Sequence, residues 1–168
     1  MRAGRRRWLV RAFMTALLLF AVWRFATWPD AAYSVAFRPD EQHLVRHVFD
    51  GDTIELANGD RVRLIGVDTP EFNRGRPEPF AEEATRFTAA MVQGKVVRLK
   101  FDRERLDKYR RVLAFVYIED VLVNEAIVEA GMGRAMTQFG YSSRMKKLLT
   151  AAEQRARRKK LGLWSLPD

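Results

Sequence analysis

The dipeptide Asn-Gly at positions 58–59 constrains the fold of this chain more than any other short stretch. It lies between two segments, 53–56 and 61–67, that alternate in polarity or are mainly apolar, as β-strands are. Asn-Gly supplies the positive φ angles that a two-residue turn between antiparallel strands requires. The sequence therefore predicts a hairpin, which brings Asp52, just before its first strand, close to Asp68, just after its second.

This hairpin gathers four charged side chains at one end of a sheet: Asp52, Arg63, Asp68 and Glu71. Two carboxylates ~4 Å apart repel each other by about 4 kcal/mol at the effective dielectric constant of a protein surface. A hard divalent cation with oxygen ligands, calcium above all, removes this repulsion. Either aspartate alone is an ordinary turn residue, but the four side chains together indicate a functional site.

Five short motifs resemble those of the staphylococcal nuclease-like (thermonuclease) family, in its membrane-anchored bacterial form. They are 50–53 (DGDT), 63–71 (RLIGVDTPE), 107–111 (DKYRR), 123–126 (VNEA) and 163–165 (LWS). They follow one another in the family's order. The resemblance implies a calcium-dependent, sugar-nonspecific endonuclease that hydrolyses phosphodiester bonds of DNA and RNA at the P–O5′ bond. It also implies a preference for substrate that is single-stranded or locally open.

The resemblance assigns the cation to Asp52, Asp68 and the backbone carbonyl of Thr69, with Asp50 lying just outside these ligands. Glu71 corresponds to the general base, or to the group that orients the attacking water. A general base must lie within hydrogen-bond reach of the proton that it removes. The implied cofactor is Ca²⁺, and its ligands come from the first two motifs.

Arg63 and Arg111 match the two arginines that bind the scissile phosphate in this family. Guanidinium suits this task because it offers paired donors in one plane and stays charged. Lys108 and Tyr109 match residues that contact a terminal phosphate of the nucleotide. The sequence departs from the family at Arg110, where a glycine usually precedes the second arginine. If this position needs a positive φ, Arg110 is strained or the loop shifts, and the aim of Arg111 changes.

Two positions that hold base-flanking tyrosines in the family are Thr137 and Phe139 here. Phe139 can still stack on a base, whereas Thr137 cannot, and Tyr141 is the alternative stacking residue. Stacking is worth ~1–3 kcal/mol per base, so the change affects affinity without abolishing cleavage. The segment 72–78 also departs from the family, and we expect it to alter the preferred shape of the substrate.

The remaining pattern predicts a mainly β fold with added helices (α+β), a five-stranded OB-fold barrel with three helices. The strands are expected at 43–49, 53–56, 61–67, 96–101 and 112–118. The helices are expected to begin at Pro79, at Val123, and at Ser142 or Ser143. The intervening segments 72–78 and 102–111 are expected to be irregular.

The fold by itself does not decide between catalysis and binding. The alternative function is a catalytically inactive nuclease-like OB-fold module that binds nucleic acid or protein. The last expected helix adds a basic face, which is usually only solvated, the alternative being that it attracts polyanions.

Residues 1–28 form a different kind of segment, with six arginines and no acidic residue around the uncharged run 12–23 (AFMTALLLFAVW). We expect an N-terminal hydrophobic helix that anchors the chain in a membrane, with its arginine-rich start in the cytoplasm. Residues 29–40 are then a tether, and 41–168 are the nuclease-like domain on the extracytoplasmic side, periplasmic or outer. A cleaved signal peptide, followed by secretion, is the alternative.

The net charge comes largely from this segment. The chain has 30 Lys and Arg against 21 Asp and Glu, but six of the basic residues lie in 1–28, which leaves 24 against 21. The total of +9 is therefore mainly a sign of membrane topology and is not counted toward nucleic acid. With 168 residues and no cysteine, we expect one domain without disulfides that acts as a monomer.

Overall fold

The computed structural model describes residues 41–73 and 76–167. All of them belong to one compact unit, Arg38–Asp168. The expected hydrophobic segment 1–28 and the tether 29–40 lie outside the described residues. Among the helices of the described part, none is long and apolar enough to cross a membrane.

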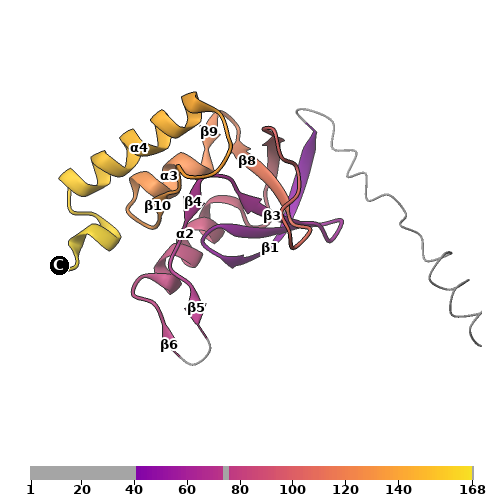
Figure 1. The fold of residues 1–168 in the computed structure, drawn as a ribbon. Helices are drawn as coiled ribbons and strands as arrows, with labels where there is room; N and C mark the ends of the chain where they lie inside the picture. Colours follow the sequence, from indigo (N-terminus) through magenta and orange to yellow (C-terminus); the bar gives the residue numbers. More distant parts are fainter. Residues whose placement is uncertain (1–40, 74–75, 168) are drawn as a thin grey trace, which may run out of the picture. The chain divides into compact units, whose positions relative to one another are not determined.

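Five strands form a closed barrel (Figure 1). They are β1 (Gln42–Asp50), β2 (Thr53–Leu56), β3 (Arg61–Leu64), β7 (Val96–Lys100) and β8 (Val112–Ile118). Antiparallel pairs join β1 to β2 and β7, β2 to β3, and β7 to β8. Parallel pairing of β3 with β8 closes the barrel, with Val62 opposite Val112. This architecture confirms the expected OB-like barrel.

The expected strand 61–67 is divided in two. β3 ends at Leu64, and β4 (Val67–Asp68) pairs instead with β10 (Arg134–Ala135). Gly66 causes the break, because it has φ 75° and a Cβ there would lie 2.6 Å from Tyr141 Oη. The two residues between β3 and β4 redirect the chain, so that Asp68 lies outside the barrel sheet and opposite Arg134 of β10.

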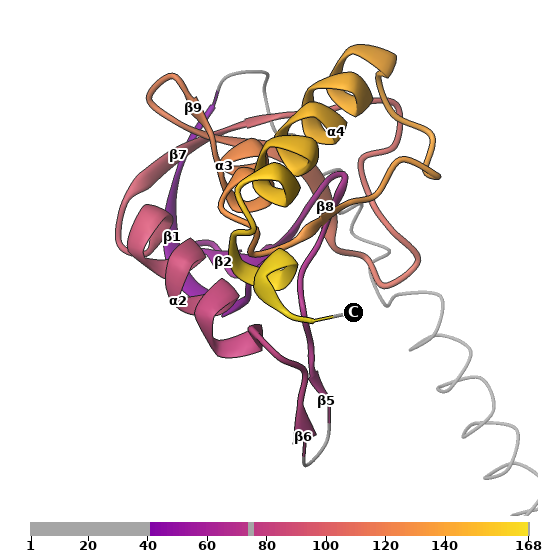
Figure 2. The ribbon, with the colours of Figure 1, turned by 90° about the vertical axis from the view of Figure 1, so that its left-hand side faces the viewer.

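The expected irregular segment 72–78 contains a small hairpin. β5 (Phe72–Asn73) pairs with β6 (Arg76–Pro77), and the hairpin projects away from the barrel in Figures 1 and 2. At the other end of the sheet, β9 (Val121–Leu122) turns back on β8. The expectation that 72–78 is irregular was wrong, because strands of two residues leave almost no periodic signal in the sequence.

Three α-helices cover the barrel in the described part of the chain, as expected (Figure 2). They are α2 (Ala81–Val92), α3 (Val123–Glu129) and α4 (Ser143–Arg158), followed by a 3-10 helix, η1 (Gly162–Ser165). α2 begins after Pro79, because Phe80 adopts a left-handed conformation with φ 71°. Ser142 is the N-cap of α4 as predicted, but its hydroxyl makes no capping bond.

The barrel interior is filled by alternating apolar side chains such as Ile54, Leu64 and Leu99. One fully buried polar side chain, Asn124 on α3, connects this core to the rim of the barrel. Its amide donates to the Ile65 carbonyl and accepts from the Val116 N–H, both at 2.9 Å. α3 therefore fixes the chain at the end of β3, where the charged side chains gather.

Candidate active site

The turn between β1 and β2 holds the first acidic motif. The Asp52 N–H donates to Asp50 Oδ1 at 3.0 Å, and Thr88 Oγ on α2 donates to the Gly51 carbonyl at 2.7 Å. A Cβ on Gly51 would lie 2.7 Å from the Thr69 side chain, so that only glycine allows this close approach. Burial raises the pKa of Asp50 above its ordinary value, against the opposing effects of Thr53 and nearby arginines.

Asp52 is 2% exposed, yet its carboxylate is well supplied with donors. Thr69 donates to Oδ2 twice, from its backbone N–H at 3.0 Å and its hydroxyl at 3.2 Å. Thr53 Oγ1 donates to Oδ1 at 3.1 Å. A buried carboxylate needs such partners, because desolvating it without them is costly. The sequence had pointed only to the Thr69 carbonyl, and these two donors of Thr69 were missed.

Arg63 joins the two predicted acidic ligands. Its guanidinium forms an ion pair with Asp52 Oδ1, lies 3.4 Å from Asp68 Oδ1 and donates to the Val67 carbonyl at 3.1 Å. The two carboxylates therefore converge in that both contact the same guanidinium group, that of Arg63. Burial lowers the pKa of Arg63, the Asp50 carboxylate opposes this shift, and the Arg111 guanidinium adds to it.

The loop before β8 positions Arg111 through Asp107. Asp107 Oδ1 accepts the backbone N–H groups of Tyr109 and Arg111, both at 2.9 Å, and Oδ2 accepts Arg111 Nε at 2.7 Å. Burial by itself raises the pKa of Asp107. The hydrogen bonds and the Arg111 charge outweigh burial, so that the pKa lies below its ordinary value. No role was predicted for Asp107 from the sequence, although an aspartate in a charged loop is a recognisable turn signal.

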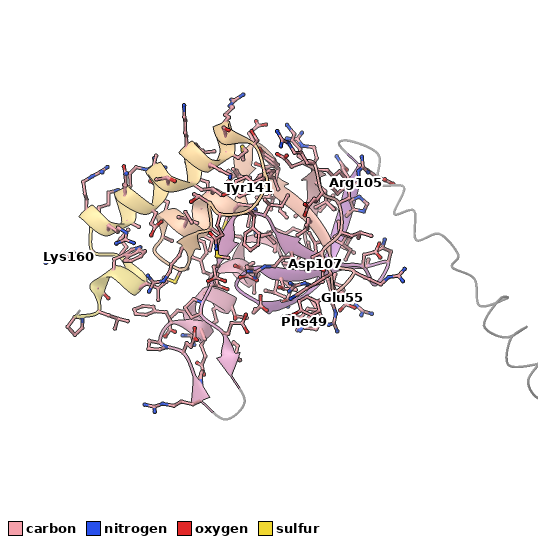
Figure 3. The ribbon with its side chains drawn as sticks, viewed as in Figure 1. Phe49, Glu55, Arg105, Asp107, Tyr141 and Lys160 are labelled. Atoms are coloured by element: carbon pink, nitrogen blue, oxygen red, sulfur yellow. The ribbon has the colours of Figure 1, made fainter. Side chains whose placement is uncertain are left out.

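Arg110 does adopt the conformation that a glycine would adopt more easily. Its φ is 64°, in the left-handed region that costs a residue with a Cβ roughly 1–2 kcal/mol. The loop nevertheless directs Arg111 toward the site, because Arg63 and Arg111 line the same cavity. In Figure 3 Asp107, which holds Arg111, lies at the edge of the barrel.

This cavity has a volume of about 500 Å³. Six of the predicted site residues line it: Arg63, Lys108, Tyr109, Arg111, Phe139 and Tyr141. Tyr109 and Phe139 are 68% and 57% exposed, so that each offers a ring face to a ligand. We call this cavity the arginine cleft.

Tyr141 has a different environment from the other two aromatic residues. It is 7% exposed, its hydroxyl donates to the Met136 carbonyl at 2.7 Å, and its ring meets the Phe115 ring edge-on at 5.9 Å. Burial raises the pKa of its hydroxyl to about 12. Tyr141 is part of the cleft wall, and the stacking expected of it does not fit this position.

Glu71 is not among the residues that line the arginine cleft. It is exposed at the base of the β5–β6 hairpin. Its N–H donates to Glu78 Oε2 at 3.1 Å, and its carbonyl accepts the Glu78 N–H at 3.0 Å. These bonds fix its backbone, while its carboxylate faces solvent.

The chemistry of the two aspartates fits a hard cation. The described residues contain no group of three or more His, Cys, Asp or Glu side chains that could hold a metal ion. Asp52 and Asp68 supply two carboxylates that already share one positive charge, that of Arg63. Calcium takes six to eight oxygen ligands, so that backbone, water or substrate oxygens must complete its shell.

A closed five-stranded barrel with two arginines over a cleft and a buried aspartate beside it defines an OB-like barrel suited to a phosphate-containing ligand. Residues 61–166 match the family described as "Staphylococcal nuclease homologue". The chain belongs to this family, which confirms the resemblance to the family as a whole and supports a nuclease function.

Named relatives agree with this assignment. The chain is 37% identical over 129 residues to a thermonuclease of Staphylococcus intermedius, which covers 74% of this chain and 76% of the relative. It is 31% identical over 134 residues to a thermonuclease of Staphylococcus hyicus, with 75% and 77% covered. It is also 34% identical over 122 residues to the endonuclease YncB of Bacillus subtilis (strain 168), with 69% and 58% covered.

Proposed function

We propose that this chain is a calcium-dependent, sugar-nonspecific endonuclease that hydrolyses the P–O5′ bond of DNA and RNA. One observation carries the proposal: Arg63 lines the arginine cleft together with Arg111 and also contacts both Asp52 and Asp68. Phosphate-binding and cation-binding groups are thus neighbours. The rest of the proposal follows from what these side chains can do.

The two arginines bind the scissile phosphate. Arg111 lowers the pKa of Arg63, which means that the two positive charges are close enough to repel each other. A phosphodiester between them replaces this repulsion with paired, charge-assisted hydrogen bonds. Negative charge grows on the phosphoryl oxygens during attack, so that fixed guanidinium groups stabilise the transition state more than the ground state.

Asp52, Asp68 and the Thr69 carbonyl would hold the calcium ion. When bound, Ca²⁺ supplies positive charge beside the phosphate and makes a coordinated water easier to deprotonate. Arg63 then no longer has to neutralise the two carboxylates and pairs with the phosphate instead.

Glu71 accepts the proton of the attacking water. Its carboxylate must lie about 2.6–3.2 Å from that water, or act through one further water. Because its backbone is tied to Glu78 at the base of the β5–β6 hairpin, the position of the hairpin decides whether it reaches the nucleophile.

Exposed aromatic rings account for a broad choice of substrate. Tyr109 and Phe139 present ring faces at the cleft, and every base offers a face for stacking. Lys108, which also lines the cleft, contacts a terminal phosphate. Stacking requires unpaired bases, so that single-stranded or locally open DNA and RNA are the preferred substrates.

The proposed location follows from the first residues of the sequence. The segment 1–28 anchors the protein in a membrane, and the nuclease domain acts as a monomer on the extracytoplasmic side. Cell fractionation that recovers the chain in the membrane pellet, with the domain open to added protease in intact spheroplasts, supports this placement. Recovery of a shortened chain in the medium favours signal cleavage and secretion.

Cleavage of a labelled single-stranded oligonucleotide by the full chain tests the enzymatic proposal. We expect cleavage in calcium, none in chelator, and a large loss for Glu71→Gln but not for Glu83→Gln, an exposed carboxylate on α2. Breaking the P–O5′ bond leaves 3′-phosphate and 5′-hydroxyl ends, so that the products accept a new 5′-phosphate without prior dephosphorylation. An oligonucleotide that is bound equally with and without calcium, and never cut, identifies a binding module instead.

A further inference from the structure

A second cavity, of about 670 Å³, lies on the outer face of β7 and β8 beside the start of α4. We call it the α4 groove. Its lining includes Lys100, Phe101, Tyr117, Arg144 and Lys147. The volume is in the range of roughly 300–1,000 Å³ that is usual for ligand sites.

The α4 groove and the arginine cleft are separated by one thin wall. Asp102 lines both cavities. Phe115 lines the groove, Tyr141 lines the cleft, and their rings are in contact at 5.9 Å. In Figure 3 Tyr141 lies near the start of α4, and Lys160 lies at its opposite end. A strand that leaves the cleft therefore has the groove as its neighbour.

Three basic side chains line the groove. Lys100, Arg144 and Lys147 form no ion pair with a carboxylate of the described residues. By contrast, two arginines further along α4 are paired, Arg155 with Glu125 and Glu129, and Arg157 with Glu153. Arg158 and Lys159 at the end of α4 form no ion pair with a carboxylate of the described residues either. The groove is therefore distinguished from the end of the helix by its hollow and its aromatic lining, in addition to its positive charge.

Aromatic rings stand among these cations. Tyr117 is partly exposed, and Lys100 Nζ and Arg98 Cζ lie 4.9 Å and 5.7 Å from the centre of its ring. The acidic residue Asp102 is already occupied, because Oδ1 accepts the Arg103 N–H at 2.8 Å and Oδ2 accepts the Ser142 N–H at 3.0 Å. Positive charge combined with accessible rings is the arrangement that binds single-stranded nucleic acid without sequence preference.

We propose that the α4 groove binds nucleotides of the same DNA or RNA strand whose scissile phosphate lies in the arginine cleft. This inference rests on the proposed endonuclease function. Lys100, Arg144 and Lys147 contact backbone phosphates, and Tyr117 offers a ring face to a base. The groove makes long strands better substrates than short ones and leaves the chemistry at the cleft unchanged.

Binding of the full chain to labelled single-stranded DNA in chelator, where the reaction does not run, is the first test. The variant Lys100→Ala/Lys147→Ala is compared with Arg158→Ala/Lys159→Ala, which removes the same charge at the far end of α4. For a strand of ~12 nucleotides, the slope of log K against log salt should fall by about 1.4, about 0.7 for each phosphate contact that is lost. The control pair should keep the wild-type slope. Equal slopes for the two variants overturn the proposal.

Cleavage separates a failure of this inference from a failure of the endonuclease proposal. We expect the ratio of kcat/KM for the long strand to that for a dinucleotide to fall about fivefold or more in the groove variant. Wild-type protein that cuts neither substrate refutes the endonuclease proposal. Wild-type protein that cuts both, with an unchanged ratio in the groove variant, refutes the groove alone.

The variant Arg144→Glu, which reverses one charge in the groove, tests whether weaker DNA binding is caused by misfolding. Arg144→Glu places a negative charge in the first turn of α4, where the helix dipole favours it. We expect the melting temperature to stay at or above that of the wild type while binding of the long strand weakens. Unchanged binding with an intact melting curve counts against the groove.

Discussion

Removing the guanidinium of Arg63 should make the stability of this fold depend on calcium. Arg63 is paired with Asp52, which is 2% exposed, and lies 3.4 Å from Asp68, whose side chain is 45% exposed. In Arg63→Ala both carboxylates lose the cation that they share. Calcium, if these two residues bind it, should then replace the missing charge.

The size of the effect follows from burial. Removing one partner of a buried ion pair costs about 3–5 kcal/mol. Asp52 keeps three hydrogen bonds, from the N–H and hydroxyl of Thr69 and the hydroxyl of Thr53, so that we expect the lower value, about 3 kcal/mol. The half-exposed contact to Asp68 adds less than about 1 kcal/mol. Calcium at 100 times its Kd stabilises any fold that binds it by about 2.7 kcal/mol, the wild type included. The loss is therefore restored only as far as the variant, in which Arg63 no longer competes for the two carboxylates, binds the ion more tightly.

Urea unfolding of the full chain measures this prediction. In chelator we expect the free energy of unfolding of Arg63→Ala to be about 3 kcal/mol below that of the wild type. In saturating calcium the difference should narrow to about 1 kcal/mol, which corresponds to roughly thirtyfold tighter calcium binding by the variant than by the wild type. The same variant should lose about 10³–10⁵ in cleavage rate, the usual contribution of an arginine in phosphoryl transfer.

The control is Arg61→Ala, which removes an arginine two positions earlier on β3. Its guanidinium lies 4.3 Å from the Phe49 ring. Its response to calcium should equal that of the wild type. If calcium raises the free energy of unfolding of neither the wild type nor Arg63→Ala, the cation does not bind at Asp52 and Asp68, and the metal part of the proposal is wrong.

Three further predictions concern the framework of the site. Arg110→Gly should raise the free energy of unfolding by about 0.5–1 kcal/mol, because it removes the cost of φ 64° but adds freedom to the unfolded chain; a loss would show that the Arg110 side chain outweighs its backbone strain. Asn124→Ala should cost about 2–3 kcal/mol in urea unfolding, because the buried Ile65 carbonyl and Val116 N–H lose their partner; a cost below about 1 kcal/mol would contradict this. Asp107→Asn should be less stable than the wild type at neutral pH, and the difference should vanish as the pH falls below 3.8 and through the lowered pKa of Asp107. A difference that persists in acid would show that the charge of Asp107 is not its cause.

Local sequence patterns predicted the hairpin and the residues at its open end. Gly59 has φ 89°, as the Asn-Gly turn requires, and Asp52 and Asp68 do meet through Arg63. The break at Gly66 was missed, because apolar residues continue across it and a glycine within a strand can also be a bulge. The left-handed Phe80 was missed for a different reason, since no residue pattern predicts φ 71° at a phenylalanine.

Contacts between distant segments decided the rest of the site. Arg111 reaches Arg63 because β8 lies parallel to β3, a pairing that no local pattern contains. Tyr141 is buried because it packs against Phe115 of β8, which sequence periodicity does not reveal. The family resemblance pointed to Arg63 and Arg111, and Tyr141 was the alternative stacking residue, but the burial of each one depends on the tertiary fold.

The parallel pairing of β3 with β8 also has a consequence for how the protein matures. Arg63 lies on β3 and Arg111 just before β8. The two arginines therefore face the same cleft only after β3 and β8 have paired and the barrel has closed. Closure over so long a separation is among the slow steps of folding. On the proposed function, a chain that ends before β8 has no cleft in which the two arginines can hold a phosphate, and cleavage activity should appear during refolding only once the barrel has closed.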